Sequence, residues 1–81
     1  MTADQLQAII RAGLPCEYLT VDGDGSHWYA TIVSAEFAGK RLLARQRLVY
    51  ATMGTRIDTN EVHALSMKTY TPEEWAAKSA A

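Results

Sequence analysis

The sequence contains little cysteine, little net charge and no long hydrophobic run, and each absence excludes a class of protein. Its single cysteine, Cys16, cannot form an internal disulfide, which is typical of a reducing compartment such as the cytosol. No apolar run approaches the length of a membrane span, and the first residues lack the basic and apolar regions of a signal peptide. The formal net charge of −1 provides no general attraction to nucleic acid or to an anionic membrane. We therefore expect a soluble cytoplasmic protein.

What the chain does contain is enough apolar material for one core. Hydrophobic residues make up 48% of the 81 residues, which argues against disorder. A chain of this length has no room for a second domain, so we expect a single domain over residues 1–81.

Two helices are predicted near the ends of the sequence. Residues 2–13 have an amphipathic pattern, and Thr2 and Gln5 have the spacing of a capping box. Residues 72–79 follow Thr71, which can cap a helix, and Glu74 lies three residues later, as a second capping box requires.

The main helix is predicted over residues 40–53. We expect its apolar residues to contact the core, namely Leu42, Leu43, Val49, Tyr50 and Met53. We expect its basic residues to lie mostly on the solvent side, namely Lys40, Arg41, Arg45 and Arg47. Residues 55–61 form either a polar turn or a short second helix.

Three segments have the composition of strands: residues 16–22, 27–34 and 62–70. The first two are joined by DGDGS, whose two Asp-Gly pairs can supply the positive-φ positions of a tight turn, so we expect an antiparallel hairpin. The third arrives through a helical crossover and should lie parallel to the second. The predicted order α-β-β-α-α-β-α is an α+β fold, a three-stranded mixed sheet with helices on one face.

Two histidines begin predicted strands, His27 the second and His63 the third. If these strands are parallel neighbours, both imidazoles lie towards the same end of the sheet, where they could bind zinc, copper or iron. Two histidines cannot complete a tetrahedral site, and Cys16 begins the first strand, at the end opposite to His27. The chain therefore offers at most half a metal site, which a second protein would complete. The alternative, that both histidines make structural hydrogen bonds, is favoured by the spacing alone.

The remaining polar residues give weaker signals. Lys40, Arg41, Arg45 and Arg47 could meet a phosphate backbone, but a solvated helix face is commonly this charged. We expect Cys16 to be buried and inert. No carboxylate is placed to orient His27 beside Ser26, so we expect a binding protein and no enzyme.

Three motifs together resemble the BolA-like protein family, in particular its bacterial YrbA/IbaG type. They occur in the order and at the spacing typical of that family, and the resemblance extends from about residue 5 to Trp75. The motifs are DGDGSHW at residues 22–28, FAGK at 37–40 leading to RQRLVY at 45–50, and VHALSMKTYTP at 62–72.

The resemblance implies a fold like the type II K-homology domain and a partnership with monothiol glutaredoxins. In the family, such heterodimers hold a [2Fe-2S] cluster or form without it, and act in iron–sulfur trafficking and iron regulation. By this resemblance the cluster ligands fall on His63 and His27, and the glutaredoxin cysteine and the thiol of glutathione supply the other two. Half a site is what a shared cluster needs.

The same family is also linked to transcription and DNA binding, which provides an alternative function. Contacts to DNA would then come from the basic helix, through Lys40, Arg41, Arg45 and Arg47. The segment FAGK lacks the second glycine of a Gly-x-x-Gly clamp, which weakens an RNA-binding interpretation of the usual kind.

Overall fold

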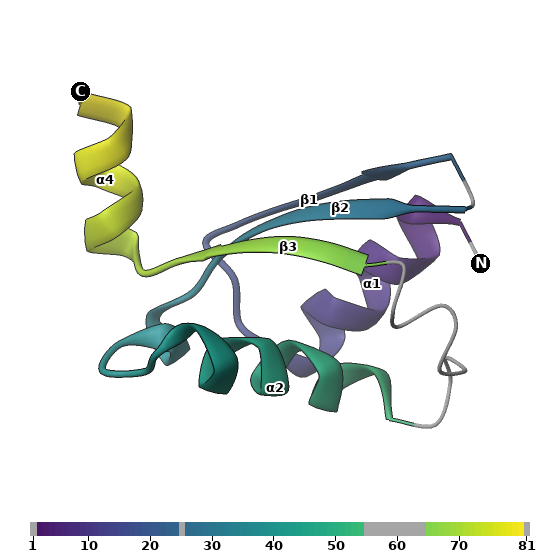
Figure 1. Cartoon of the computed structure of the whole chain (residues 1–81), viewed down its shortest axis with the longest axis horizontal. Coiled ribbons are helices and arrows are strands. Elements are labelled where there is room, and N and C mark those ends of the chain that lie inside the picture. Colours follow the sequence, from purple (N-terminus) through teal and green to yellow (C-terminus); the bar gives the residue numbers. More distant parts are fainter. Residues whose placement is uncertain (1, 25, 55–64, 81) are drawn as a thin grey trace.

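The computed structural model describes residues 2–24, 26–54 and 65–80 of the chain (Figure 1). In chain order the elements are α1 (Ala3–Gly13), β1 (Tyr18–Gly23), β2 (Trp28–Val33), the 3₁₀ helix η1 (Ala35–Phe37), α2 (Leu42–Met53), β3 (Leu65–Tyr70) and α4 (Pro72–Ala80). The predicted α+β order is confirmed for these elements. The segment 55–61 and the predicted start of the third strand, 62–64, lie outside the described residues.

The three strands form one mixed sheet in the order β1-β2-β3. β1 and β2 are antiparallel, with Tyr18 opposite Val33 and Gly23 opposite Trp28. β2 and β3 are parallel, with Trp28 beside Leu65 and Val33 beside Tyr70. Both predicted pairings are therefore confirmed, and β2 and β3 begin at the same end of the sheet.

Helices α1 and α2 cover one face of the sheet and enclose the core (Figure 1). The helices approach closely where Gly13 meets Thr52, since a Cβ at Gly13 would lie 2.8 Å from the Thr52 Cβ. The buried core combines side chains from both helices, η1 and all three strands: Leu6, Ile10, Leu14, Leu19, Val21, Trp28, Ala30, Ile32, Phe37, Val49, Met53 and Leu65.

The start of α2 does not follow the prediction. Val49 and Met53 are buried as expected, but Leu42 and Leu43 are each 59% exposed, so their prediction as core contacts is wrong. One turn before Val49 the core-facing side of α2 carries Arg45, whose side chain is only 13% exposed. Arg45, and neither leucine of the first turn, is therefore the residue of this part of α2 that is mostly buried.

Helix α4 stands at the end of the sheet and extends away from the layer of α1 and α2 (Figure 1). None of its described residues is buried. The Trp75 ring stacks on Tyr18 at 5.0 Å between centroids and lies 5.2 Å from the Tyr70 ring. The predicted capping box of α4 is confirmed. The Glu74 N–H donates to Thr71 Oγ1 at 3.1 Å, and the Thr71 N–H donates to Glu74 Oε1 at 2.8 Å.

Candidate functional site

The hairpin between β1 and β2 is held by a single carboxylate. Asp24 Oδ1 accepts hydrogen bonds from the backbone N–H groups of Ser26 at 2.8 Å and His27 at 3.0 Å. The Asp24 N–H donates in turn to the His27 carbonyl at 3.2 Å, so the ladder continues one pair beyond Gly23 and Trp28. The hydrogen bond from the His27 N–H, followed by that from Ser26, holds the pKa of Asp24 below its usual value. The predicted hairpin turn is therefore confirmed, and Asp24 is the side chain that stabilises it.

Gly23 has a different role from the one its Asp-Gly pair suggests. It belongs to β1, and among the described residues only Gly39 and Gly54 have positive φ, so the predicted turn role of Gly23 is wrong. A Cβ at Gly23 would lie 2.3 Å from the His27 carbonyl oxygen and 2.8 Å from Trp28 Cδ1. Only a residue without a side chain lets β2 approach this closely.

His27 is exposed immediately before β2. Within the part of the chain that the structure describes, its imidazole has no hydrogen bond or ion pair, so both ring nitrogens are available there. The described residues also contain no group of three or more His, Cys, Asp or Glu side chains that could hold a metal ion alone. His63 lies two residues before Leu65 in the sequence and outside the described residues, so its closeness to His27 stays a prediction.

Cys16 lies at the other end of the sheet, because the start of β1 pairs with Val33, the end of β2. Its exclusion as a partner of His27 is therefore confirmed. The thiol is half-buried and donates to the Leu14 carbonyl at 3.2 Å. Burial raises its pKa, more than nearby Arg11 lowers it, which disfavours the thiolate that metal binding needs.

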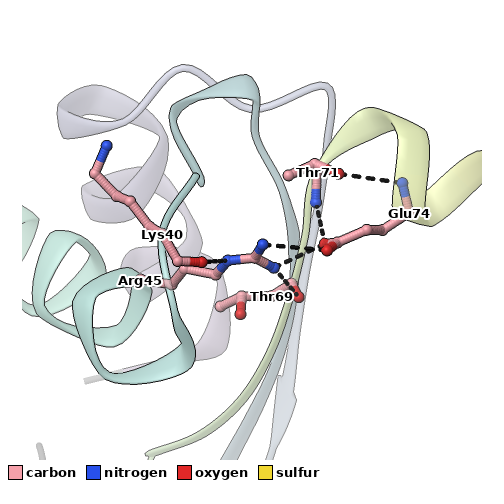
Figure 2. Close-up of polar contacts among 5 residues, drawn as sticks. All are labelled: Lys40, Arg45, Thr69, Thr71 and Glu74. Atoms are coloured by element: carbon pink, nitrogen blue, oxygen red, sulfur yellow. Dashed lines mark hydrogen bonds and ion pairs between the residues drawn. The ribbon is translucent and has the colours of Figure 1, made fainter. Parts of the chain in front are cut away.

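Arg45 forms hydrogen bonds and an ion pair within the chain (Figure 2). The prediction that it faces solvent is therefore wrong. Its guanidinium forms two bonds with the Glu74 carboxylate, at 2.7 and 3.2 Å, and donates to the carbonyls of Lys40 at 2.8 Å and Thr69 at 3.3 Å. It also lies 5.8 Å from the centre of the Phe37 ring. The hydrogen bond from Arg45 is the main cause that lowers the pKa of Glu74 to about 2.

The other three predicted basic residues, Lys40, Arg41 and Arg47, are exposed. These three basic residues and the exposed Leu42 and Leu43 are here called the α2-start patch. Sequence reasoning placed both leucines in the core and missed this patch. No local pattern separated these leucines from core residues, because adjacent apolar positions such as Leu48 and Val49 do contact the core of this chain.

Comparison with known proteins finds relatives along almost the whole chain. The family described as BolA-like protein matches residues 11–74. The acid stress protein IbaG of Escherichia coli (strain K12) is 36% identical over 76 residues, covering 94% of this chain and 90% of that protein. The DNA-binding transcriptional regulator BolA of Vibrio cholerae is 47% identical over 53 residues, covering 65% of this chain and 49% of that protein.

A solved structure agrees with these relatives. The bolA protein homologue from Coxiella burnetii superposes with a TM-score of 0.81 at 36% identity, covering 94% of this chain and 97% of that one. The expected likeness to the type II K-homology fold stays a prediction. The matched motifs, the shared fold and the extent of the match establish that the chain belongs to the BolA-like protein family, of the bacterial IbaG type.

Proposed function

We propose that the protein is an accessory protein without catalytic activity of its own, which pairs with a monothiol glutaredoxin. In this proposal the pair shares a [2Fe-2S] cluster, ligated on this side by His27 and His63, and acts in iron–sulfur trafficking and in iron and redox regulation. The proposal includes a cytoplasmic location, in keeping with the single cysteine. No helix in the described part of the chain is long and apolar enough to cross a bilayer.

The observation that carries the proposal is an exposed imidazole at the end of the sheet where β2 and β3 begin together. Imidazole is a suitable ligand for iron, and His27 has no competing partner among the described residues. His63 comes two residues before β3 in the sequence, and in this proposal it lies at the same end. An incomplete ligand set of this kind suits a cluster completed by a partner.

The bound cluster would supply electron transfer and transferable iron, and this chain would set its properties through imidazole ligation. Histidine in place of thiolate raises the reduction potential of a [2Fe-2S] centre, as in Rieske proteins. Ligand imidazoles must also be unprotonated, because a protonated imidazole cannot bind iron, so acid should weaken binding of the cluster.

The α2-start patch supports a protein partner. Leu42 and Leu43 are both 59% exposed, and they adjoin the basic residues Lys40 and Arg41. Neighbouring exposed apolar side chains are candidate sites for contact with a partner protein. A partner surface with apolar groups and acidic residues at its edge would fit this patch.

The test is reconstitution with a monothiol glutaredoxin, glutathione, iron and sulfide, followed by visible absorption and circular dichroism. We expect His27→Ala and His63→Ala each to change the visible spectrum and to accelerate cluster loss. Ser26→Ala is the matched control, since it alters an exposed neighbour in the same turn and leaves both imidazoles in place. Spectra that are unchanged in both histidine variants, or a mixture that never forms a heterodimer, would contradict the proposal.

The second candidate function is DNA binding, favoured by the exposure of Lys40, Arg41 and Arg47 and by the name of the Vibrio cholerae relative. Arg45 is a poor candidate contact because its guanidinium is bound within the chain. Binding to a DNA duplex should weaken steeply with salt, and Arg47→Glu should weaken it further. Absence of binding at low salt would remove this candidate.

A further inference from the structure

We propose that Asp24 is a positioning residue for His27. Asp24 holds the backbone of His27 and leaves the imidazole of His27 free to bind the cluster. This inference rests on the proposed function, because it concerns how the chain presents one ligand of the shared cluster. It adds a role for Asp24, a residue that sequence reasoning assigned only to the turn.

Asp24 contacts the backbone of His27 on both sides of that residue. Its carboxylate accepts the His27 N–H at 3.0 Å, and its own N–H donates to the His27 carbonyl at 3.2 Å. The same carboxylate oxygen accepts the Ser26 N–H at 2.8 Å, so the two residues preceding β2 are fixed to one point. An ionised acceptor makes these bonds stronger than those of a neutral one.

In an exposed turn the position of the His27 backbone depends more on Asp24 than it would in a packed region. Ser26 and His27 are exposed, so within the described residues little side-chain packing restricts their backbone. On the opposite side Gly23 allows the His27 carbonyl to pass at a distance that any Cβ would prevent. Gly23 therefore permits the position of His27, and Asp24 holds it there.

This arrangement also keeps the imidazole available. The Asp24 carboxylate is directed to main-chain N–H groups, and within the described residues no hydrogen bond joins it to the His27 ring. A ligand held through its backbone loses less conformational freedom when it binds iron. Residues that orient a metal ligand commonly change metal affinity by about 10–100-fold. We expect an effect below that range, about fivefold, because Asp24 contacts only the main chain of His27.

The experiment compares four variants in the reconstituted heterodimer: Asp24→Ala, Asp24→Asn, His27→Ala and the double variant Asp24→Ala with His27→Ala. The readouts are the rate of cluster loss to EDTA and, in the free protein, hydrogen exchange of the His27 amide. We expect Asp24→Ala to lose the cluster about fivefold faster and to exchange the His27 amide faster. Asp24→Asn retains an acceptor oxygen, so it should restore both properties to within about twofold.

The double variant separates positioning from general stability. If Asp24 acts through His27, then adding Asp24→Ala to His27→Ala should produce no further acceleration of cluster loss. An equal acceleration in both backgrounds, or an Asp24→Asn variant that behaves like Asp24→Ala, would overturn the positioning role. If His27→Ala accelerates cluster loss and Asp24→Ala does not, only the positioning role fails. If His27→Ala itself has no effect, the ligand assignment of the proposed function fails as well.

Discussion

The two ends of the sheet are held by different kinds of interaction. At one end, called the clamp end, Arg45 joins α2 to the end of β3 and to the first turn of α4 through Thr69 and Glu74 (Figure 2). At the other, called the hairpin end, Asp24 closes the chain on itself through backbone groups of Ser26 and His27. One end is cross-linked by side chains from several elements, and the other by a single local turn.

The two ends differ in which polar side chains they leave available. At the clamp end the side chains of Arg45 and Glu74 pair with each other, so they have little capacity for an external partner. At the hairpin end the polar side chain of Asp24 satisfies the backbone, and the His27 imidazole is left exposed. The clamp end therefore uses its charged side chains internally, whereas the hairpin end leaves an imidazole exposed.

The largest effect on stability should come from closing the space at Gly23. In Gly23→Ala the new Cβ would lie 2.3 Å from the His27 carbonyl oxygen, a backbone atom that can move only with its strand. We expect a loss of about 3 kcal/mol in the free energy of unfolding, measured by urea titration. Amide shifts in NMR spectra should concentrate at His27 and Trp28.

Gly39→Ala provides the control for that substitution. Gly39 has φ +74° and no atom within 4 Å of a built Cβ, so only backbone strain opposes alanine there. We expect a smaller loss of about 1 kcal/mol, without amide shifts at the hairpin end. Equal losses in the two variants would show that crowding at Gly23 has no special effect.

The next largest effect should come from removing the guanidinium at the clamp end. Arg45→Ala deletes the ion pair with Glu74 and the donors to the carbonyls of Lys40 and Thr69. We expect a loss of about 2 kcal/mol in the free energy of unfolding, because charge-assisted bonds at a mostly buried side chain are lost together. Arg45→Lys should restore little, since an ammonium cannot form the two parallel bonds.

Arg47→Ala is the matched control on the same helix, and its exposed side chain predicts a change within about 0.5 kcal/mol. A loss of equal size in Arg45→Ala and Arg47→Ala would contradict the clamp. Cluster loss from the heterodimer should not accelerate in Arg45→Ala at a temperature where the variant is folded, because the clamp lies at the other end of β2.

A smaller effect should appear in the pH dependence of the clamp. The pKa of Glu74 is lowered from 4.5 to about 2 in the folded protein, so the unfolded chain takes up a proton first as the pH falls. The contribution of Glu74 is therefore fully present above about pH 4.5 and is lost between about pH 4.5 and 2. Urea titrations of the wild type and Glu74→Gln should differ at neutral pH and converge towards pH 2. Because Glu74 is half-exposed, added salt should reduce the difference. A difference independent of pH would contradict this account.

The comparison also explains which features the sequence could predict. Both capping boxes and the hairpin depend on neighbouring residues, and their spacing identified Thr2, Thr71 and the turn correctly. The clamp depends on a contact between Arg45 and Glu74, which are 29 positions apart, and no local pattern indicates such a pair. Arg45 consequently was assigned to solvent. The role of Gly23 could not be predicted for a similar reason. The atoms that exclude a side chain at Gly23 belong to His27 and Trp28, on the opposite side of the hairpin.

The smallest effect on stability, and a large one on association, is expected at the α2-start patch. The double variant Leu42→Ser with Leu43→Ser changes side chains that are already 59% exposed, so the free energy of unfolding should change by no more than about 0.5 kcal/mol per residue. Affinity for the glutaredoxin, measured by calorimetry without the cluster, should fall about tenfold or more if the leucines are buried on binding.

Tyr29→Thr is the matched control for the patch. Tyr29 is also 59% exposed but lies on the open face of the sheet. Threonine, like tyrosine, is favoured in strands, so the substitution should preserve β2. If only the leucine variant weakens association, the partner contacts the start of α2. Equal weakening by both variants would point to a general loss of surface apolarity, and no weakening would exclude the patch from the interface. Because Leu42 and Leu43 precede Arg45 on the same helix, an interface there would lie near the clamp end, whereas the proposed ligand His27 lies at the hairpin end. A partner that reached both would have to extend along the sheet, so patch and histidine variants should weaken the cluster-bound heterodimer additively.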